Sequence, residues 1–158
     1  MTDCLFCQIV AGQAPAHTIF ESETHLAFLS IFPNTEGVSV VIPKAHHPSY
    51  VFENDPATIA ALMTAAQQTA ALLDATFDDV GRCGIVFEGF GVDHLHAKLY
   101  PLHGTGNQAE WQQIESTNNK AYYERYPGFI SSNDSKLANS EELAQLAQRI
   151  RSHKTSEV

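Results

Sequence analysis

Two histidines and a lysine alternate with apolar residues near the middle of the chain. His94, His96 and Lys98 occupy every second position, with leucine and alanine between them. Period-two alternation is typical of a β-strand, so we predict a strand over residues 94–100 with these three side chains on one face, about 7 Å apart. Three potentially cationic groups in a row repel one another unless an anion lies over them. The pattern indicates a bound phosphate, or a metal ion held by one neutral imidazole; a solvated strand face is the alternative.

The same residue types suit chemistry at phosphorus. A neutral imidazole is a good nucleophile near neutral pH, because its ordinary pKa is about 6.5. The ammonium of Lys98 suits charge stabilisation on phosphoryl oxygens, although an ordinary exposed lysine is the alternative. Gly89 and Gly91 come just before the histidines, and glycine allows the backbone to approach a ligand closely. These residues therefore predict a site for a phosphate ester or anhydride.

A Cys-x-x-Cys pair, Cys4 and Cys7, opens the chain in a segment that we predict to be a short helix ending near Gly12. The pair can be half of a zinc site, a redox motif, or two unrelated core cysteines. A redox motif usually follows a strand in a thioredoxin-like fold, and we predict no strand before Cys4. The first residues carry no signal-peptide pattern. We therefore expect a reducing cytoplasm, where a close cysteine pair more often binds a metal than forms a disulfide.

The remaining pattern indicates an α+β fold. We predict strands over residues 18–21, 26–31, 38–42 and 83–88, in addition to the one with the histidines. A long helix begins at Asp55 as N-cap and Pro56 at the first helical position. Its apolar stripe is predicted to face the core and comprises Ile59, Leu62, Met63, Ala66, Ala70, Leu73 and Phe77. About five antiparallel strands with one long inserted helix form an α+β meander.

The last third of the chain is predicted to pack on this domain. A short helix is expected over residues 110–114 and a final helix after Asn139, which with Glu142 resembles a capping box. Between them lies an aromatic-rich patch that must pack on something, made of Tyr122, Tyr123, Tyr126 and Phe129. This extension is too apolar for a loose tail.

Size and charge exclude several classes of protein. The chain has 158 residues and a net charge of −9, without a run rich in lysine or arginine. One domain with a substantial core is expected from this length. The acidic balance argues against a general nucleic-acid binder, but a small phosphate ligand needs only local cations. No apolar run approaches the roughly 20 residues of a membrane span, so we expect no membrane partner.

The segment from His94 to Pro101 resembles the signature of the histidine triad (HIT) family, in which three histidines alternate with apolar residues before a proline. His94 and His96 match the first two triad positions, whereas Lys98 stands at the third. A second family feature is a strand that ends in Pro-Lys-x-His, which His46 matches. The resemblance covers roughly residues 4–103. We therefore expect a HIT-like domain over residues 1–106, an antiparallel meander with one long helix, and a C-terminal helical extension over residues 107–158.

The resemblance also implies roles for individual residues. In the family the middle histidine attacks an α-phosphorus and forms a nucleotidyl-histidine intermediate, which here assigns the nucleophile to His96, beside His94 and Lys98. It implies a structural zinc ion and a homodimer that pairs through residues 84–88 and 56–77. The metal ligands are then Cys4, Cys7, His46 and His94, and the substrate-binding residues are Phe28, Ser30, Ile31, Gly89 and Gly91.

Two departures from the family pattern bear on activity. Lys98 replaces the third histidine, and Ser30 stands where family members usually carry an acidic residue that binds ribose hydroxyls. The leading hypothesis is a HIT-type phosphohydrolase or nucleotidyl transferase acting on a small nucleotide-like substrate. The alternatives are a non-catalytic nucleotide- or phosphate-binding module that kept the fold, and a structural zinc domain that serves as an interaction partner.

Overall fold

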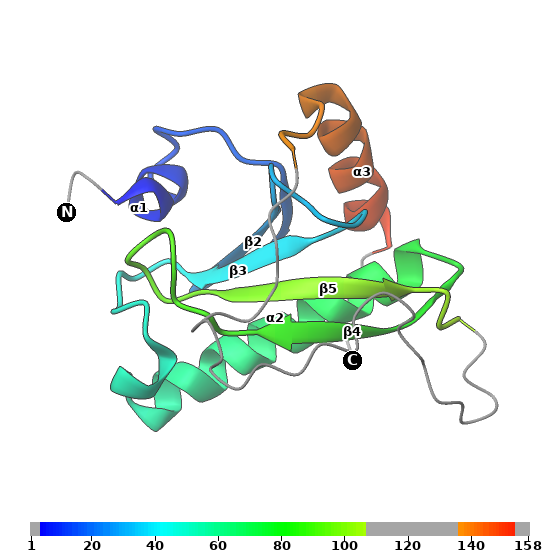
Figure 1. The fold of residues 1–158 in the computed structure, drawn as a ribbon. Coiled ribbons are helices and arrows are strands. Elements are labelled where there is room, and N and C mark those ends of the chain that lie inside the picture. Colours follow the sequence, from blue (N-terminus) through cyan, green and yellow to red (C-terminus); the bar gives the residue numbers. More distant parts are fainter. Residues whose placement is uncertain (1–3, 107–135, 154–158) are drawn as a thin grey trace, which may run out of the picture.

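The computed structural model describes residues 4–106 and 136–153 of the chain. Within these ranges a five-stranded sheet is combined with three α-helices and one short 3-10 helix (Figure 1). In chain order the elements are α1 (Leu5–Val10), β1 (Thr18–Glu21), β2 (His25–Leu29), β3 (Ser39–Pro43), η1 (Val51–Glu53), α2 (Pro56–Thr76), β4 (Val80–Val86), β5 (Ala97–His103) and α3 (Ser140–Ser152).

The strand order in the sheet is β1-β2-β3-β5-β4, and every neighbouring pair is antiparallel. The chain leaves β3, passes through α2, forms β4 at the edge and returns as β5 between β3 and β4. The predicted α+β class and the number of strands are confirmed. The last two strands differ from a simple meander in order, because the helical crossover lets β5 pair with β3.

The two faces of the sheet are covered by different helices. Leu26 and Phe28 of β2 pack with Phe6 of α1 on one face, together with Val40 and Ile42 of β3. The alternate residues face a larger core on the other side, which α2 and α3 cover. Because β2 and β3 bury both faces, their sequences are continuous apolar runs rather than alternating ones.

Helix α2 begins as predicted, because the Asp55 carboxylate accepts hydrogen bonds from the backbone nitrogens of Ala57 and Thr58, both at 3.0 Å. The prediction that Met63 belongs to the core stripe was wrong, because this residue is 42% exposed. The buried face is turned so that Thr69 lies in the core, where its hydroxyl is satisfied by the Ala65 carbonyl at 2.8 Å. A hydroxyl that bonds back within its own helix can occupy an apolar face, and hydrophobicity alone does not predict this.

Helix α3 belongs to the same packed unit as the sheet. The Asn139 side chain accepts hydrogen bonds from the Glu141 and Glu142 nitrogens, as expected for the predicted N-cap. The buried side chains of α3 join the larger core and comprise Leu143, Leu146, Ala147 and Ile150. The expected helix over residues 110–114 and the aromatic patch lie outside the described residues. No helix in the described ranges has the length and apolar character needed to cross a membrane.

Candidate metal centre and active site

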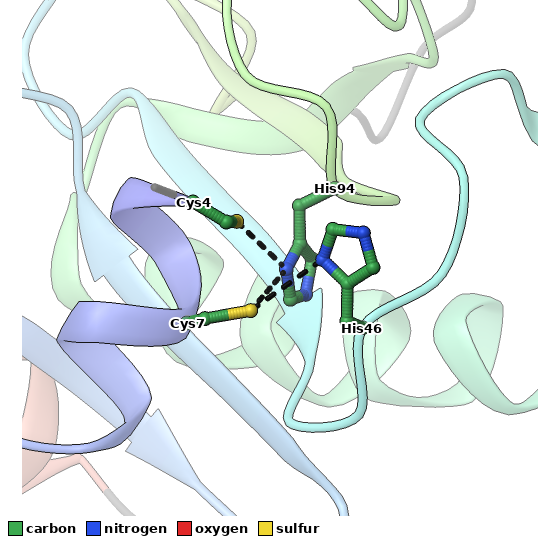
Figure 2. Close-up of side chains that lie close together, drawn as sticks. All are labelled: Cys4, Cys7, His46 and His94. Atoms are coloured by element: carbon green, nitrogen blue, oxygen red, sulfur yellow. Dashed lines mark hydrogen bonds between the residues drawn. The ribbon is translucent and has the colours of Figure 1, made fainter. Parts of the chain in front are cut away.

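Four side chains from three separate segments meet on the α1 face of the sheet (Figure 2). They are Cys4 and Cys7 at the start of the chain, His46 after β3, and His94 before β5. Their ligand atoms all lie within 4.8 Å of one another. The cluster contains the four residues that were predicted to bind a metal.

The distances within this cluster fit a tetrahedral zinc site. The Cys4 Sγ and Cys7 Sγ atoms lie 3.5 Å and 3.6 Å from His94 Nδ1, and Cys7 Sγ lies 3.4 Å from His46 Nδ1. Zinc bonded to sulfur at about 2.3 Å and to nitrogen at about 2.0–2.1 Å places tetrahedral S and N ligands about 3.5 Å apart. Two thiols and two imidazoles are also a donor set that zinc favours. The four residues therefore fit a closed zinc site without a position for substrate.

Both ring nitrogens of His94 face protein groups. Its Nε2 donates to the Pro43 carbonyl at 2.8 Å, so Nδ1 carries the lone pair and faces the thiols. Burial lowers the pKa of His94, and the neighbouring histidines lower it further, so the ring is neutral near pH 7. A neutral ring held by a backbone carbonyl is the usual form of a metal-binding histidine. Burial and then the neighbouring Cys4 raise the pKa of the Cys7 thiol.

Two hydrogen bonds donated by backbone nitrogens hold together the segments that carry these histidines. The Leu95 nitrogen donates to the His47 carbonyl at 2.9 Å, and the Ser49 nitrogen donates to the Asp93 carboxylate at 3.1 Å. The second bond lowers the pKa of Asp93. The backbone of Gly89 lies so close to Ser49 that a Cβ atom at Gly89 would be 3.1 Å from the Ser49 carbonyl oxygen. The loop after β3 is thus fastened to the loop before β5.

His96 is held in one orientation by its neighbour in the chain. Its Nδ1 donates to the His94 carbonyl at 2.7 Å, which leaves the lone pair on Nε2. Only 2% of the residue is exposed, and the Phe6 ring meets the imidazole edge-on with a centroid distance of 5.5 Å. Burial lowers the pKa of His96, and the positive charge of Lys98 lowers it further. His96 is therefore a neutral imidazole of defined tautomer.

The expected strand over residues 94–100 was wrong at its start. Strand β5 begins at Ala97, and its pairing with β3 begins at the Val41–Ala97 pair. His94 and His96 precede the strand because the backbone there bonds elsewhere: the His94 nitrogen donates to Val92 and the Leu95 nitrogen to His47. Both imidazoles still lie on the α1 side, where both contact Phe6, but they are buried rather than on a solvated face.

Lys98 pairs with Glu88, which the sequence analysis did not single out. Its ammonium contacts the Glu88 carboxylate, and both side chains are largely shielded, with 16% and 12% of their surface exposed. The β4–β5 register pairs Val86 with Lys98, and Glu88 lies two residues beyond Val86, the last residue of β4. The sequence contains one signal for this pair: the two residues have opposite charge and lie near the facing ends of consecutive strands.

The expected substrate-binding residues divide into buried and open positions. Phe28 is 6% exposed and packs edge-on against Phe6, whereas Ile31 is 45% exposed. The Ser30 hydroxyl accepts a hydrogen bond from the Phe32 nitrogen at 3.2 Å. Gly89 and Gly91 have φ values of +68° and +86°, which side chains disfavour. Gly89 needs this freedom to approach Ser49, while a Cβ at Gly91 would meet nothing within 4 Å.

Comparisons with known proteins agree with this architecture. The family model described as the HIT domain matches residues 11–104. A HIT-like protein of Mycoplasma genitalium is 31% identical over 129 residues, which cover 79% of this chain and 90% of that protein. An adenosine 5'-monophosphoramidase of Schizosaccharomyces pombe is 32% identical over 98 residues, covering 62% of this chain and 73% of that protein. A zinc-bound histidine triad family protein of Mycobacterium smegmatis has a similar fold, with a TM-score of 0.64 at 24% identity over 96% of this chain and 92% of that one. The chain belongs to the HIT family.

Proposed function

We propose that this protein cleaves or transfers the phosphoryl group of a small nucleotide-like substrate, with His96 as the nucleophile. The observation that carries the proposal is the 2.7 Å hydrogen bond from His96 Nδ1 to the His94 carbonyl, because it fixes the proton on Nδ1 and leaves the Nε2 lone pair for attack. The related phosphoramidase of Schizosaccharomyces pombe supports a nucleotide as substrate.

The proposed reaction has two displacement steps at phosphorus. In the first, His96 Nε2 forms a bond to phosphorus while the bond to the leaving amine or phosphate breaks, and the leaving group takes a proton from water or from a neighbouring group. The His94 carbonyl, bonded to Nδ1–H, stabilises the positive charge that the imidazole gains. In the second, water attacks phosphorus and the bond to Nε2 breaks, which regenerates the neutral ring, and the proton that the water loses passes to the solvent.

We assign Cys4, Cys7, His46 and His94 to a structural zinc ion. The three sulfur–nitrogen distances of 3.5, 3.4 and 3.6 Å, which suit tetrahedral zinc, and the zinc-bound relative of similar fold support this assignment. A zinc ion bound here would cross-link the segment with α1 to the loops that carry His46 and His94. Because its ring nitrogens face the thiols and Pro43, His94 acts in catalysis through its backbone carbonyl.

The decisive experiment is detection of the covalent intermediate. The protein is mixed with adenosine 5'-phosphoramidate, quenched rapidly under alkaline conditions that preserve a phosphorus–histidine bond, and analysed by mass spectrometry. We expect an adenylyl group on His96, its absence in His96→Ala, and its retention in the control His153→Ala, at the exposed end of α3. Full hydrolytic activity in His96→Ala would overturn the assignment.

A second candidate is a binding module that retained the fold without turnover. The ion pair between Lys98 and Glu88 favours it, because the cation at the third triad position already has an anionic partner. In the same experiment, nucleotide binding without adduct or turnover would support this alternative.

We further propose a cytoplasmic homodimer. Strand β4 is an edge of the described sheet, and its residue Ile85 is 37% exposed. Pairing of residues 84–88 with a second copy, together with α2, would cover this edge.

A further inference from the structure

A shielded ion pair occupies the position at which the triad pattern calls for a third imidazole. Lys98 lies on β5 two residues after His96, and its partner Glu88 lies just beyond β4. Ala97 and Leu99, which alternate with these side chains, face the opposite core. Lys98 therefore lies on the same side of the sheet as the proposed nucleophile, and the carboxylate of Glu88, which contacts the Lys98 ammonium, lies on that side too.

This pairing changes the charge that an incoming phosphate meets. An isolated lysine attracts a doubly charged phosphate more strongly than a singly charged one, because Coulomb energy scales with the product of the charges. The carboxylate of Glu88, in contact with the ammonium, opposes that field. Salt screens such a shielded pair less than it screens exposed charges. Glu88 thereby cancels much of the positive field that Lys98 would otherwise present to a phosphate.

We propose that Glu88 sets the charge selectivity of the site by removing the advantage of a doubly charged terminal phosphate. The preferred ligands are then phosphoryl groups with a single negative charge, as in nucleoside phosphoramidates and phosphodiesters. This inference rests on the proposed function, since it requires that a nucleotide phosphate binds beside His96.

The selectivity has a consequence for turnover. A phosphate monoester has a second pKa of about 6 and therefore carries a charge of about −1.5 to −2 at neutral pH. A phosphoramidate or diester has one acidic oxygen and carries a single charge. Hydrolysis thus converts a singly charged substrate into a doubly charged product. Glu88 weakens binding of the product more than binding of the substrate, and so limits product inhibition.

The test compares two ligands that differ in charge but hardly in shape, AMP and its methyl ester, by calorimetry near pH 8, where AMP is doubly charged. Three proteins are compared: the unmodified chain, Glu88→Gln, and the control Glu21→Gln. Glu21 is a matched control, because it pairs with Lys44 at 2.7 Å, outside the proposed site. A carboxylate-to-amide change removes the charge and keeps the shape.

We expect the unmodified protein and Glu21→Gln to bind the two ligands within roughly threefold of each other, or to favour the ester. Glu88→Gln should favour AMP by roughly tenfold, because removal of one nearby negative charge benefits a dianion about twice as much as a monoanion on a logarithmic scale. An unchanged AMP-to-ester ratio in Glu88→Gln overturns the proposal. If Glu88→Gln does not fold, the unmodified protein decides, since a tenfold or greater preference for AMP also overturns it. Absence of binding of either ligand to the unmodified protein refutes the proposed function instead.

Discussion

Replacement of Cys4 by alanine should abolish the stabilisation that the proposed zinc ion would give to the fold. Cys4 Sγ lies 3.5 Å from His94 Nδ1, so alanine would remove one of four ligands and leave an incomplete site. Zinc at a thousandfold excess over its dissociation constant stabilises a protein by about 4 kcal/mol, if it binds only the folded state. At about 2–4 °C per kcal/mol for a chain of this size, this corresponds to roughly 8–16 °C in melting temperature.

The assay is thermal melting with and without a strong chelator, together with zinc content by elemental analysis. The unmodified protein should contain about one zinc ion per chain, and its melting temperature should fall by roughly 8–16 °C when the chelator is added. Cys4→Ala should melt, with or without chelator, at the temperature that the unmodified protein shows in the presence of chelator. Cys83→Ala is the matched control, because Cys83 lies outside the cluster and its thiol contacts Asp74. It should keep the full chelator response. A chelator response that survives in Cys4→Ala, or a zinc-free unmodified protein, would refute the assignment.

The remaining predictions concern the nucleophile, its cationic neighbour, one titrating pair and assembly. His96→Ala should abolish turnover of adenosine 5'-phosphoramidate while AMP affinity, measured by calorimetry, stays within about tenfold, because a nucleophile acts mainly in the transition state; equal losses in both would contradict this role. Lys98→Ala should weaken AMP binding by about 1.5–3 kcal/mol, since the ligand loses a charge-assisted hydrogen bond; unchanged affinity would show that Lys98 does not contact the phosphate. Burial opposes charging of His103, but hydrogen bonds to the Glu36 carbonyl and to Asp79 outweigh it and raise its pKa. Because the pKa of His103 is higher in the folded state, its protonation stabilises the fold fully below about pH 6.5, and this stabilisation is lost as the pH rises through the folded-state pKa. The difference in melting temperature between the unmodified protein and His103→Ala should therefore be larger at about pH 6 than at about pH 9. A difference that does not change with pH would contradict the pairing of His103 with Asp79. Sedimentation at micromolar concentration should give a dimer, and a purely monomeric species would refute the proposed pairing through β4.

Much of the fold was predictable because its local signals agree with its tertiary contacts. The Asp55–Pro56 start of α2 and the Asn139 start of α3 are local capping effects, and both appear as hydrogen bonds to the first backbone nitrogens. The buried runs of β2 and β3 are long enough to identify as strands from hydrophobicity alone. Met63 was misplaced because α2 turns a threonine toward the core and bonds it internally, which shifts the buried face.

The residues that cluster at the candidate metal centre could be predicted from the sequence, whereas the contacts around the two histidines could not. The cluster of Cys4, Cys7, His46 and His94 followed from the family pattern. The acceptor for His96 and the partner of Lys98 did not, because they depend on where the backbone turns before β5 and on the β4–β5 register. The position of Phe6 in the site could not be predicted for a similar reason. Nothing in the sequence around a phenylalanine between two cysteines indicates that its ring will pack against the imidazoles of His94 and His96.

His94 joins the candidate metal centre to the candidate nucleophile. Nδ1 of its ring faces the two thiols, and Nε2 donates to the carbonyl of Pro43 at the end of β3. The backbone carbonyl of His94 accepts a hydrogen bond from His96 Nδ1. One residue therefore contributes its ring to the metal cluster and its backbone carbonyl to the hydrogen bond that fixes the tautomer of His96. If zinc binds at this cluster as proposed, it would restrain His94 without touching the substrate. The backbone carbonyl of the same residue would then hold the proposed nucleophile, His96, in its orientation.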